Sequence, residues 1–535
     1  MRASLGAAAA LSLVGAAFMP LGTATADTMP AGGVPATVSA DPLPTAQVDG
    51  VVWSMATVGN TVYATGNFTK ARPAGVKAGG AGEVARGNIM AFDLTTGKLS
   101  TSFVHTLDGQ GLRLMASPDG KRVYVGGDFT KVDGKAHNHL AAFDTATGKL
   151  IDSFAPNVHN RVRAIAATNT TVYVGGNFFN VNGKSRTRLA AVKASDGSNI
   201  DTWRPAANDD EVYALAVYGD RVIVGGRFQQ LNGEKHVGIG AVSATNGGSL
   251  AWSSKPIPTK DGQGGFSYVT DLRIQNGVVY GAADGELYHW FDGRFAAKAD
   301  TGALVWLDNC YGATYGILPV GQTVYSVGHP HDCSSLGAFG ETNPKTFHRT
   351  LAETFDARGT DQSKPGTNSN YSKQPIPALL DWFPKLGMGS FTKQYQAAWA
   401  VTGNSTYVAM GGEFPNVNGK AQAGLVRFAI KAQAPNKVGP TTGIKAPTVS
   451  RTSTGLKVSW TGTWDMDNGW LHYEVLRDSS TTALTSVKRL SKFWAEPSMT
   501  FTDAKAAKGK HTYRIRVHDP LGNTITSPAS AAVTW

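Results

Sequence analysis

The chain has 535 residues, including 63 glycines and 25 prolines, and carries a formal net charge of +11. Charged residues make up only 17% of it and hydrophobic residues 41%. This excludes an intrinsically disordered chain, which combines low hydrophobicity with high net charge, and a coiled coil, which is rich in Ala, Glu, Lys, Leu and Arg. Abundant glycine among β-branched and aromatic residues favours many short strands joined by tight turns.

The N-terminus has the pattern of a secretory signal peptide. Arg2 supplies a positive charge, residues 5–18 are largely apolar, and Ala24-Thr25-Ala26 fits the small-residue cleavage pattern. The apolar stretch is shorter than the roughly 20 residues that a membrane-spanning helix needs. We therefore expect cleavage after Ala26 and a secreted, extracellular protein without a membrane span.

A short pattern ending in phenylalanine recurs along the chain. Residues 123–129 read Val-Tyr-Val-Gly-Gly-Asp-Phe, and close copies occupy residues 62–68, 172–178 and 222–228, with a shorter copy ending at Phe414. Four of these copies are followed by an Asp-Gly or Asn-Gly dipeptide, as at Asp133-Gly134. Such dipeptides tolerate the positive φ of two-residue hairpin turns, so a second strand is expected after each turn.

Units of about 50 residues with four short strands each are typical of the blades of a β-propeller. Weaker copies at residues 269–280 and 314–325, and a last unit from Ala398 to Ile430, bring the count to seven units and predict an all-β fold. The last unit, which ends near Ile430, lacks a fourth strand. We expect the segment that begins near Asp41 to supply this strand, because closure of the ring removes an exposed sheet edge.

The motifs Val-Tyr-Val-Gly-Gly-Asp-Phe, Val-Asp-Gly and Leu-Ala-Ala-Phe-Asp resemble the delta-sixty class of propeller repeats of exported bacterial proteins. The resemblance covers residues 40–430. It implies a seven-bladed propeller within residues 27–430, with blades from about residue 40, and little about activity. Residues 334–396 interrupt the repeat and are expected to be an insertion. Within it, residues 380–384 resemble residues 151–156, so they are expected to restore the outer strand of the sixth unit.

A second domain is expected after a linker at residues 431–444, which contains Pro and Gly and lacks periodicity. Residues 445–535 contain several segments with strand-like alternation, and their length fits a β-sandwich. Trp460, Tyr473 and Tyr513 stand where fibronectin type III domains place their aromatic residues, so this region resembles that family. Trp464 and Trp470 flank a loop, where they are either sugar-stacking platforms or buried side chains.

A ring of candidate binding residues follows from the repeat. The first strand of each unit is expected to begin at the mouth of the central channel, where aromatic faces stack on sugars and arginine binds carboxylate or phosphate. The alternative is that these side chains only pack between blades. The residues concerned are Trp53, Arg113, Arg163, Tyr213, Thr270, Tyr315 and Trp399.

Cations in the loops after each repeated phenylalanine are expected to lie on the same face and to extend this site. They are Lys135, His137, Lys184, Arg186, Arg188, Lys235, His236 and Lys420.

The two cysteines, Cys310 and Cys333, are expected to form a disulfide, because export exposes them to an oxidising environment. His329, His331 and Asp332 precede Cys333 and are weak candidates for metal ligands, since their spacing fits no common zinc pattern. No metal and no cofactor are expected.

These patterns favour a secreted binding protein that recognises a glycan or an anionic polymer of the cell envelope, a class of partner that suits the positive net charge. Nucleic acid is not an expected partner. One alternative is a polysaccharide-degrading hydrolase or lyase with its site at the channel mouth, and another is a scaffold for protein–protein interaction. A carboxylate cluster facing the channel would favour the enzyme, and a ring of aromatics and arginines would favour the glycan-binding protein.

Overall fold

The computed structural model describes residues 33, 35–253, 267–285, 291–362 and 371–535, and its regular structure is almost entirely β. The described part of the chain contains one short 3-10 helix, η1 (Ser334–Leu336). It contains no helix that is long and apolar enough to cross a membrane. The signal peptide expected at residues 1–26 lies outside the described residues, so cleavage after Ala26 stays a prediction.

Antiparallel sheets of three or four strands follow one another between Val51 and Ala429. In each sheet the strands pair in chain order, so that each sheet is a meander. The sheets are β2 (Val51–Val58), β3 (Thr61–Asn67) and β6 (Ile89–Asp93); β7 (Gly111–Ala116), β8 (Arg122–Gly127) and β11 (Leu140–Asp144); β12 (Val162–Ala167), β13 (Thr171–Gly176) and β16 (Leu189–Lys193); β17 (Val212–Tyr218), β18 (Arg221–Gly226), β21 (Ile239–Ser243) and β22 (Ser249–Leu250); β23 (Ser267–Gln275), β24 (Val278–Gly285), β25 (Arg294–Lys298) and β26 (Leu304–Asp308); β27 (Thr314–Val320), β28 (Thr323–Gly328) and β29 (Thr350–Thr354); and β32 (Ala398–Gly403), β33 (Tyr407–Gly412) and β36 (Leu425–Ala429).

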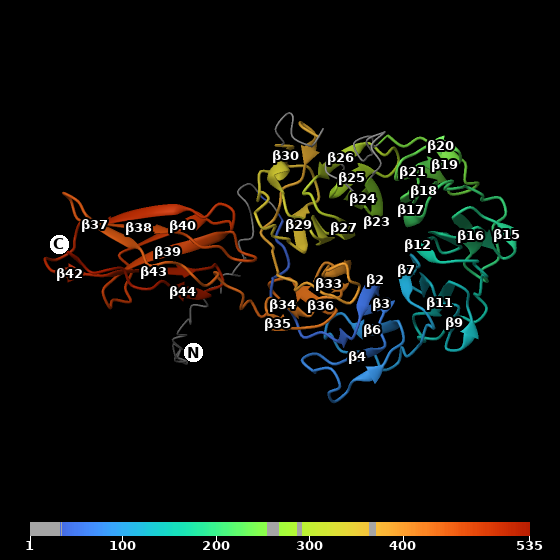
Figure 1. Cartoon of the computed structure of the whole chain (residues 1–535), viewed down its shortest axis with the longest axis horizontal. Coiled ribbons are helices and arrows are strands. Elements are labelled where there is room, and N and C mark those ends of the chain that lie inside the picture. The colour runs from blue at the N-terminus through green and yellow to red at the C-terminus, as the bar shows by residue number, and fades with distance from the viewer. Residues whose placement is uncertain (1–32, 34, 254–266, 286–290, 363–370) are drawn as a thin grey trace, which may run out of the picture.

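The first strands of these sheets form a closed ring. Strands β2, β7, β12, β17, β23, β27 and β32 contact one another in that order, and β32 also contacts β2. Figure 1 shows the sheets arranged around a centre, with the blue β2 beside the orange β33. The chain therefore folds as a β-propeller, which confirms the prediction from the repeat.

The Gly-Gly pair of the repeated motif has a packing role in this ring. A Cβ atom added to Gly126 would lie 2.6 Å from Cγ1 of Val162 in the next sheet, and Gly175 stands in the same relation to Val212, at 2.5 Å. Gly411 faces Val52 at 2.7 Å and so repeats the contact between the last sheet and the first. The motif lacks side chains at this position because the first strand of the next sheet lies against it.

Short hairpins follow the repeated phenylalanines. Asp133, Asn182, Asn232 and Asn418 all have φ near +50°, and each is followed by a glycine with positive φ, as the Asp-Gly and Asn-Gly dipeptides predict. The hairpins are β9 (Lys131–Val132) with β10 (Lys135–Ala136), β14 (Asn180–Val181) with β15 (Lys184–Ser185), β19 (Gln230–Leu231) with β20 (Glu234–Lys235), and β34 (Asn416–Val417) with β35 (Lys420–Ala421). Further short pairings join β1 (Gln47–Val48), β4 (Lys70–Arg72) and β5 (Val84–Ala85), and β30 (Gly359–Thr360) with β31 (Pro375–Ile376).

The N-terminal segment completes the last sheet, as the sequence predicted. Leu43 donates its backbone N–H to Arg427 at 2.9 Å, and Ser39 donates to Ala429 at 2.8 Å. Both acceptors belong to β36, and a bridge between Val38 and Ile430 extends the pairing. The ring is thus closed by strands from the two ends of the propeller.

Residues 334–396 also contain the third strand of their sheet, which corrects the predicted bounds of the insertion. This strand is β29, and the N–H of Leu380 donates to its Ala352 at 2.8 Å. The segment around Leu380 therefore takes the position of the outer strand, as its resemblance to residues 151–156 predicted. The irregular part is limited to the connections on either side of β29.

The C-terminal region forms two facing sheets. Trp460, Tyr473 and Tyr513 are buried between them together with Leu471 and Ile515. One sheet contains β37 (Thr448–Arg451), β38 (Leu456–Thr461) and β41 (Ser498–Asp503), and the other contains β40 (Thr485–Leu490), β39 (Trp470–Arg477), β43 (Tyr513–His518) and β44 (Thr524–Thr526), while β42 (Lys510–His511) pairs with β45 (Val533–Thr534). This is a β-sandwich, and its assignment to the fibronectin type III family stays a prediction.

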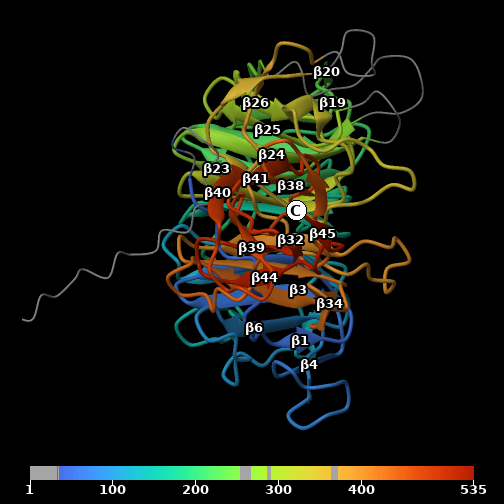
Figure 2. The ribbon, with the colours of Figure 1, turned by 90° about the vertical axis from the view of Figure 1, so that its left-hand side faces the viewer.

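The sandwich is docked on the propeller. The N–H of Phe383 donates to Met466 at 2.8 Å, Lys431 pairs with the buried Asp467 at 2.8 Å, and Lys492 pairs with Asp381. The connection at residues 431–444 contains no strand. Figure 2, seen from the sandwich side, shows β39 and β44 in front of the ring. The two parts therefore share a fixed contact surface.

Candidate functional site

Each first strand of the propeller carries a β-bulge near its start. The pairing register shifts by one residue between the first and second strands of every sheet in the ring. A bulge adds one unpaired residue and redirects its side chain. The bulged residues are Trp53, Leu112, Arg163, Tyr213, Thr270, Tyr315 and Trp399.

The bulged residues line one cavity at the centre of the ring, with a volume of about 330 Å³. We call it the channel cavity. It contains all of the predicted ring residues: Trp53, Arg113, Arg163, Tyr213, Thr270, Tyr315 and Trp399. Among its other lining residues are Gln110, Arg161, Tyr268, Asp271, Arg273, Asp284 and Gln394.

Arg113 reaches the cavity from a different register than expected. The bulge of β7 lies at Leu112, so Leu112 is the equivalent of Trp53 and Arg113 follows it. Arg113 is only 7% exposed and pairs with Asp271 of β23 at 2.5 Å, across the ring. Its role in the structure is therefore an ion pair in the floor of the cavity.

Asp271 is held by several donors. It accepts the backbone N–H groups of Leu272 at 2.9 Å and Ile317 at 3.2 Å, and Arg273 lies 3.4 Å away. Burial alone would raise the pKa of Asp271, but the charges of Arg113 and Arg273 lower it below its ordinary value. Two guanidinium groups thus share one ionised carboxylate, which leaves an excess of positive charge in the floor.

One wall of the channel cavity is made of three aromatic rings in edge-to-face and tilted contact. The ring centroids of Trp53 and Trp399 are 4.9 Å apart, and those of Trp399 and Tyr315 are 4.2 Å apart. The indole N–H of Trp53 donates to Gln110 at 2.9 Å. The indole N–H of Trp399 donates to Glu413 at 3.4 Å. Since the polar atoms of these side chains are bonded at the edges, this wall offers apolar ring surface.

The opposite wall combines tyrosines with arginines. Tyr213 and Tyr268 lie 5.7 Å apart, and the guanidinium of Arg163 lies 4.5 Å from the centre of the Tyr213 ring. Arg163 contacts Glu211 through Nη1 at 3.1 Å. Burial raises the pKa of Tyr213 to about 12, so this phenol is neutral at physiological pH.

Two carboxylates lie near the tyrosines. Asp284 accepts the hydroxyl of Tyr268 at 2.6 Å. Asp292 accepts the N–H of Gly312 at 2.7 Å, and its pKa is raised to about 8 by burial and by the charge of Asp284. Asp292 is therefore protonated at neutral pH.

Sequence reasoning missed Tyr268, Asp271, Arg273 and Asp284. A signal for two of them was present, because Asp271 and Arg273 alternate along β23 directly after the bulged Thr270. Tyr268 and Asp284 face each other in the register of β23 and β24, which the weak repeat in this sheet did not define.

The loop cations do not line the channel cavity. Lys135 pairs with Asp152 at 2.6 Å, Lys184 pairs with Asp201, and Arg186 also contacts Asp201 at 2.9 Å. These contacts join each hairpin to the segment that leads to the next sheet. These cations therefore do not extend the lining of the channel cavity, which corrects that part of the prediction.

The histidines proposed as weak metal ligands face different partners. His331 contacts Glu341 at 3.0 Å, whereas His329 lies 3.3 Å from the hydroxyl of Tyr315. Among the described residues, the cluster with metal-ligand spacing is Asp308, Cys310 and Cys333, and its cysteines are bonded to each other. The disulfide prediction is confirmed.

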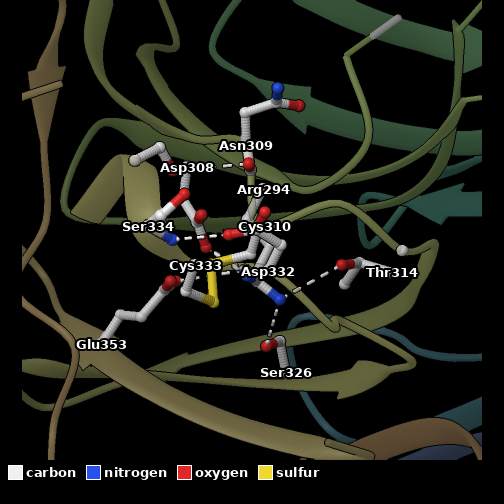
Figure 3. The surroundings of a disulfide bond; sticks show 12 residues. Arg294, Asp308, Asn309, Cys310, Thr314, Ser326, Asp332, Cys333, Ser334 and Glu353 are labelled. Atoms are coloured by element: carbon white, nitrogen blue, oxygen red, sulfur yellow. Dashed lines mark hydrogen bonds and ion pairs between the residues drawn. A yellow bond between two sulfur atoms is a disulfide. The ribbon is translucent and has the colours of Figure 1, made fainter. Parts of the chain in front are cut away.

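The disulfide lies beside a buried group of charges (Figure 3). Nε of Arg294 contacts Asp308 at 2.7 Å and Glu353 at 3.4 Å, and all three side chains are at most 1% exposed. Burial raises the pKa of Glu353 well above its ordinary value. This cluster supports the fold under the β28–β29 connection and does not line the channel cavity.

No family model matches the chain, and no curated protein matches it. Solved structures match about three quarters of it at low identity. A computationally designed protein, Ika8, has a TM-score of 0.39 at 11% identity and covers 73% of this chain and 99% of its own. A chain of a mitotic checkpoint complex has a TM-score of 0.42 at 12% identity and covers 75% of this chain and 98% of its own. The WD40 β-propeller domain of Doa1 has a TM-score of 0.38 at 11% identity and covers 75% of this chain and 100% of its own. With scores this low, the fold assignment rests on the ring of sheets itself.

Proposed function

We propose that this chain is a secreted binding protein whose channel cavity recognises an anionic glycan containing uronic acid residues. In this proposal the ring is a seven-bladed propeller of the delta-sixty type and the sandwich is a fibronectin type III domain. The observation that carries the function is the lining of the channel cavity, where five aromatic rings and four arginines meet.

The two walls suit the two parts of such a ligand. The contacting rings of Trp53, Trp399 and Tyr315 offer apolar ring surface to a sugar. Arg163, which stands over Tyr213, offers a planar guanidinium that fits a carboxylate. The cavity volume of about 330 Å³ accommodates a short oligosaccharide rather than a single ion.

The test is titration calorimetry of the full chain with tetragalacturonate and with neutral maltotetraose. Trp399→Ala removes the ring that contacts both Trp53 and Tyr315, so we expect the affinity for tetragalacturonate to fall about tenfold or more. Arg163→Gln should remove the preference for the charged tetramer over the neutral one. Added salt should weaken the wild type more than Arg163→Gln.

Phe179→Ala is the matched control, because Phe179 is 50% exposed and lies outside the channel cavity. Its affinity should equal that of the wild type. If Trp399→Ala binds tetragalacturonate as tightly as the wild type, the rings serve only to pack the sheets and the proposal fails. Absence of binding by the wild type would leave a scaffold for protein partners as the better account.

A polysaccharide-degrading hydrolase is a second candidate, favoured by the neighbouring acids Asp284 and Asp292. A carboxyl group that stays protonated at neutral pH can act as a general acid beside an ionised carboxylate. Asp292 has the raised pKa that this role needs. Release of reducing ends from polygalacturonate, abolished in Asp292→Asn, would establish the enzyme.

A further inference from the structure

A second cavity lies between the propeller and the sandwich. We call it the aromatic cleft; its volume is about 600 Å³. The propeller contributes residues 339, 340, 342, 346–350 and 383–386, and the sandwich contributes Trp464, Phe493 and Trp494. The side chains that define its character are Phe339, Phe347, His348, Phe383, Trp464, Phe493 and Trp494, together with Arg349 and Lys385.

The rings of the aromatic cleft contact one another across the boundary between the two parts. His348 stacks on Phe493 with 4.8 Å between centroids, and Phe493 lies 4.6 Å from Trp494 and 5.3 Å from Trp464. Burial lowers the pKa of His348 to about 4, so this imidazole is a neutral ring at physiological pH. The cleft thus presents several flat surfaces of the kind that bind sugars.

The charges of the aromatic cleft have one sign. Arg349 and Lys385 line it, and no Asp or Glu is found among its lining residues in the described part of the chain. Lys385 is exposed and lies 5.6 Å from the centre of the Trp464 ring. An anionic ligand is therefore favoured over a cationic or purely apolar one.

A series of rings joins the aromatic cleft to the channel cavity. Tyr315, which lines the channel cavity, is 5.8 Å from His329, and His329 is 5.8 Å from Phe347, which lines the cleft. Phe347 is 42% exposed, and Arg349 stands 5.2 Å from its centre. Pairwise ring contacts thus run from Trp399 through Tyr315 and His329 to Phe347.

We propose that the aromatic cleft is a second subsite for the anionic glycan, so that one polymer chain occupies the channel cavity and the cleft together. This inference rests on the proposed function of the channel cavity. Binding at the second subsite becomes intramolecular once the first is filled, and its effective concentration raises the affinity of a chain that is long enough to reach. A glycan chain that fills only the channel cavity gains no affinity from the second subsite.

The experiment compares tetragalacturonate with polygalacturonate fragments several times longer, using titration calorimetry on the full chain. The wild type should bind the long fragments about tenfold or more tightly than the tetramer. Phe347→Ala removes an exposed ring of the aromatic cleft, and Lys385→Glu reverses an exposed charge there. Both variants should lose most of the gain for long fragments while the affinity for tetragalacturonate stays within about twofold of the wild type.

A longer chain also offers more positions at which a single site can bind, and the variants separate this statistical gain from a second subsite. A gain that persists unchanged in Phe347→Ala and Lys385→Glu overturns the inference. Phe179→Ala, with an exposed phenylalanine outside both cavities, should keep the full gain. Failure of the wild type to bind tetragalacturonate is a different result, which contradicts the proposed function itself.

Discussion

The channel cavity and the aromatic cleft are both lined by rings and cations, but the chain builds them in different ways. Equivalent bulged positions of successive first strands supply the channel cavity, such as Trp53, Arg163 and Tyr213. Non-repeated segments on two separate parts of the fold supply the cleft. A site made by repetition inherits the rigidity of the ring, whereas a site made by docking depends on the contact that joins the parts.

The contacts that hold each site follow the same division. Arg113 of β7 and Asp271 of β23 pair directly across the ring, inside a closed set of strands. The cleft is fixed by the pair Lys492–Asp381, by the hydrogen bond from Phe383 to Met466, and by the aromatic cluster around the disulfide. Perturbing one set of contacts should therefore spare the other site, and three changes test this.

The largest effect is expected from Arg113→Ala. The substitution leaves Asp271 buried without its closest cation, which typically costs about 3–5 kcal/mol of the free energy of unfolding. Chemical denaturation followed by fluorescence measures the loss. The control Lys135→Ala removes the exposed pair with Asp152 and should cost less than about 1 kcal/mol. Equal losses in the two variants would show that the pair across the ring has no special role.

The sequence predicted the blades of the propeller more completely than the residues of its candidate site. The Gly-Gly-x-Phe pattern marks each blade because the first glycine of the pair lies against the first strand of the next sheet. At Gly126 a side chain would collide with Val162 of that strand. The repeat therefore also predicted which first-strand positions meet at the centre. The repeat did not predict the register of Arg113. A bulge shifts the alternation of side chains by one residue, and no residue type in the sequence indicates where it occurs.

The aromatic cleft was beyond the reach of the sequence. Trp464 was considered for a sugar platform, but Phe493 and Trp494 lie about 110 residues beyond Phe383, which they contact at 5.1 and 5.7 Å. Such contacts depend on how the sandwich docks, and no periodicity encodes docking. The sequence also did not show that Lys135 and Lys184 pair with acids in the segments that lead to the next sheet and so do not line the channel cavity.

An intermediate effect is expected from the double variant Cys310→Ser, Cys333→Ser. The bridge closes a loop with a sequence separation of 23, so its removal should cost about 3 kcal/mol of stability. Both cysteines pack with Phe339 and Phe383 under the aromatic cleft. We expect a lower melting temperature and a weaker gain for long polygalacturonate, with tetragalacturonate affinity retained. A variant that loses tetramer binding first would contradict the separation of the two sites.

The smallest effect concerns pH at the channel cavity. The pKa of Asp292 is about 8, above the value of about 4 for an unfolded chain. Between these pH values the carboxyl is ionised in the unfolded chain and protonated in the folded one, so the free energy of unfolding falls as pH rises from about 4 to about 8. Ionisation also adds negative charge near Tyr315, whose pKa the charge of Asp292 raises. Tetragalacturonate should therefore bind a few-fold more weakly at pH about 9 than at pH about 6.5, because its own carboxylates stay ionised throughout.

Asp292→Asn keeps the shape of the side chain and removes its titration. It should flatten the decline in affinity above pH about 7 and reduce the slope of stability with pH below about 8. Calorimetry and thermal melting over this range measure the two effects. Because Asp292 acts on the channel cavity, the ratio of long-fragment to tetramer affinity should not change with pH; a ratio that falls in parallel with tetramer affinity would mean that the two cavities respond as one site.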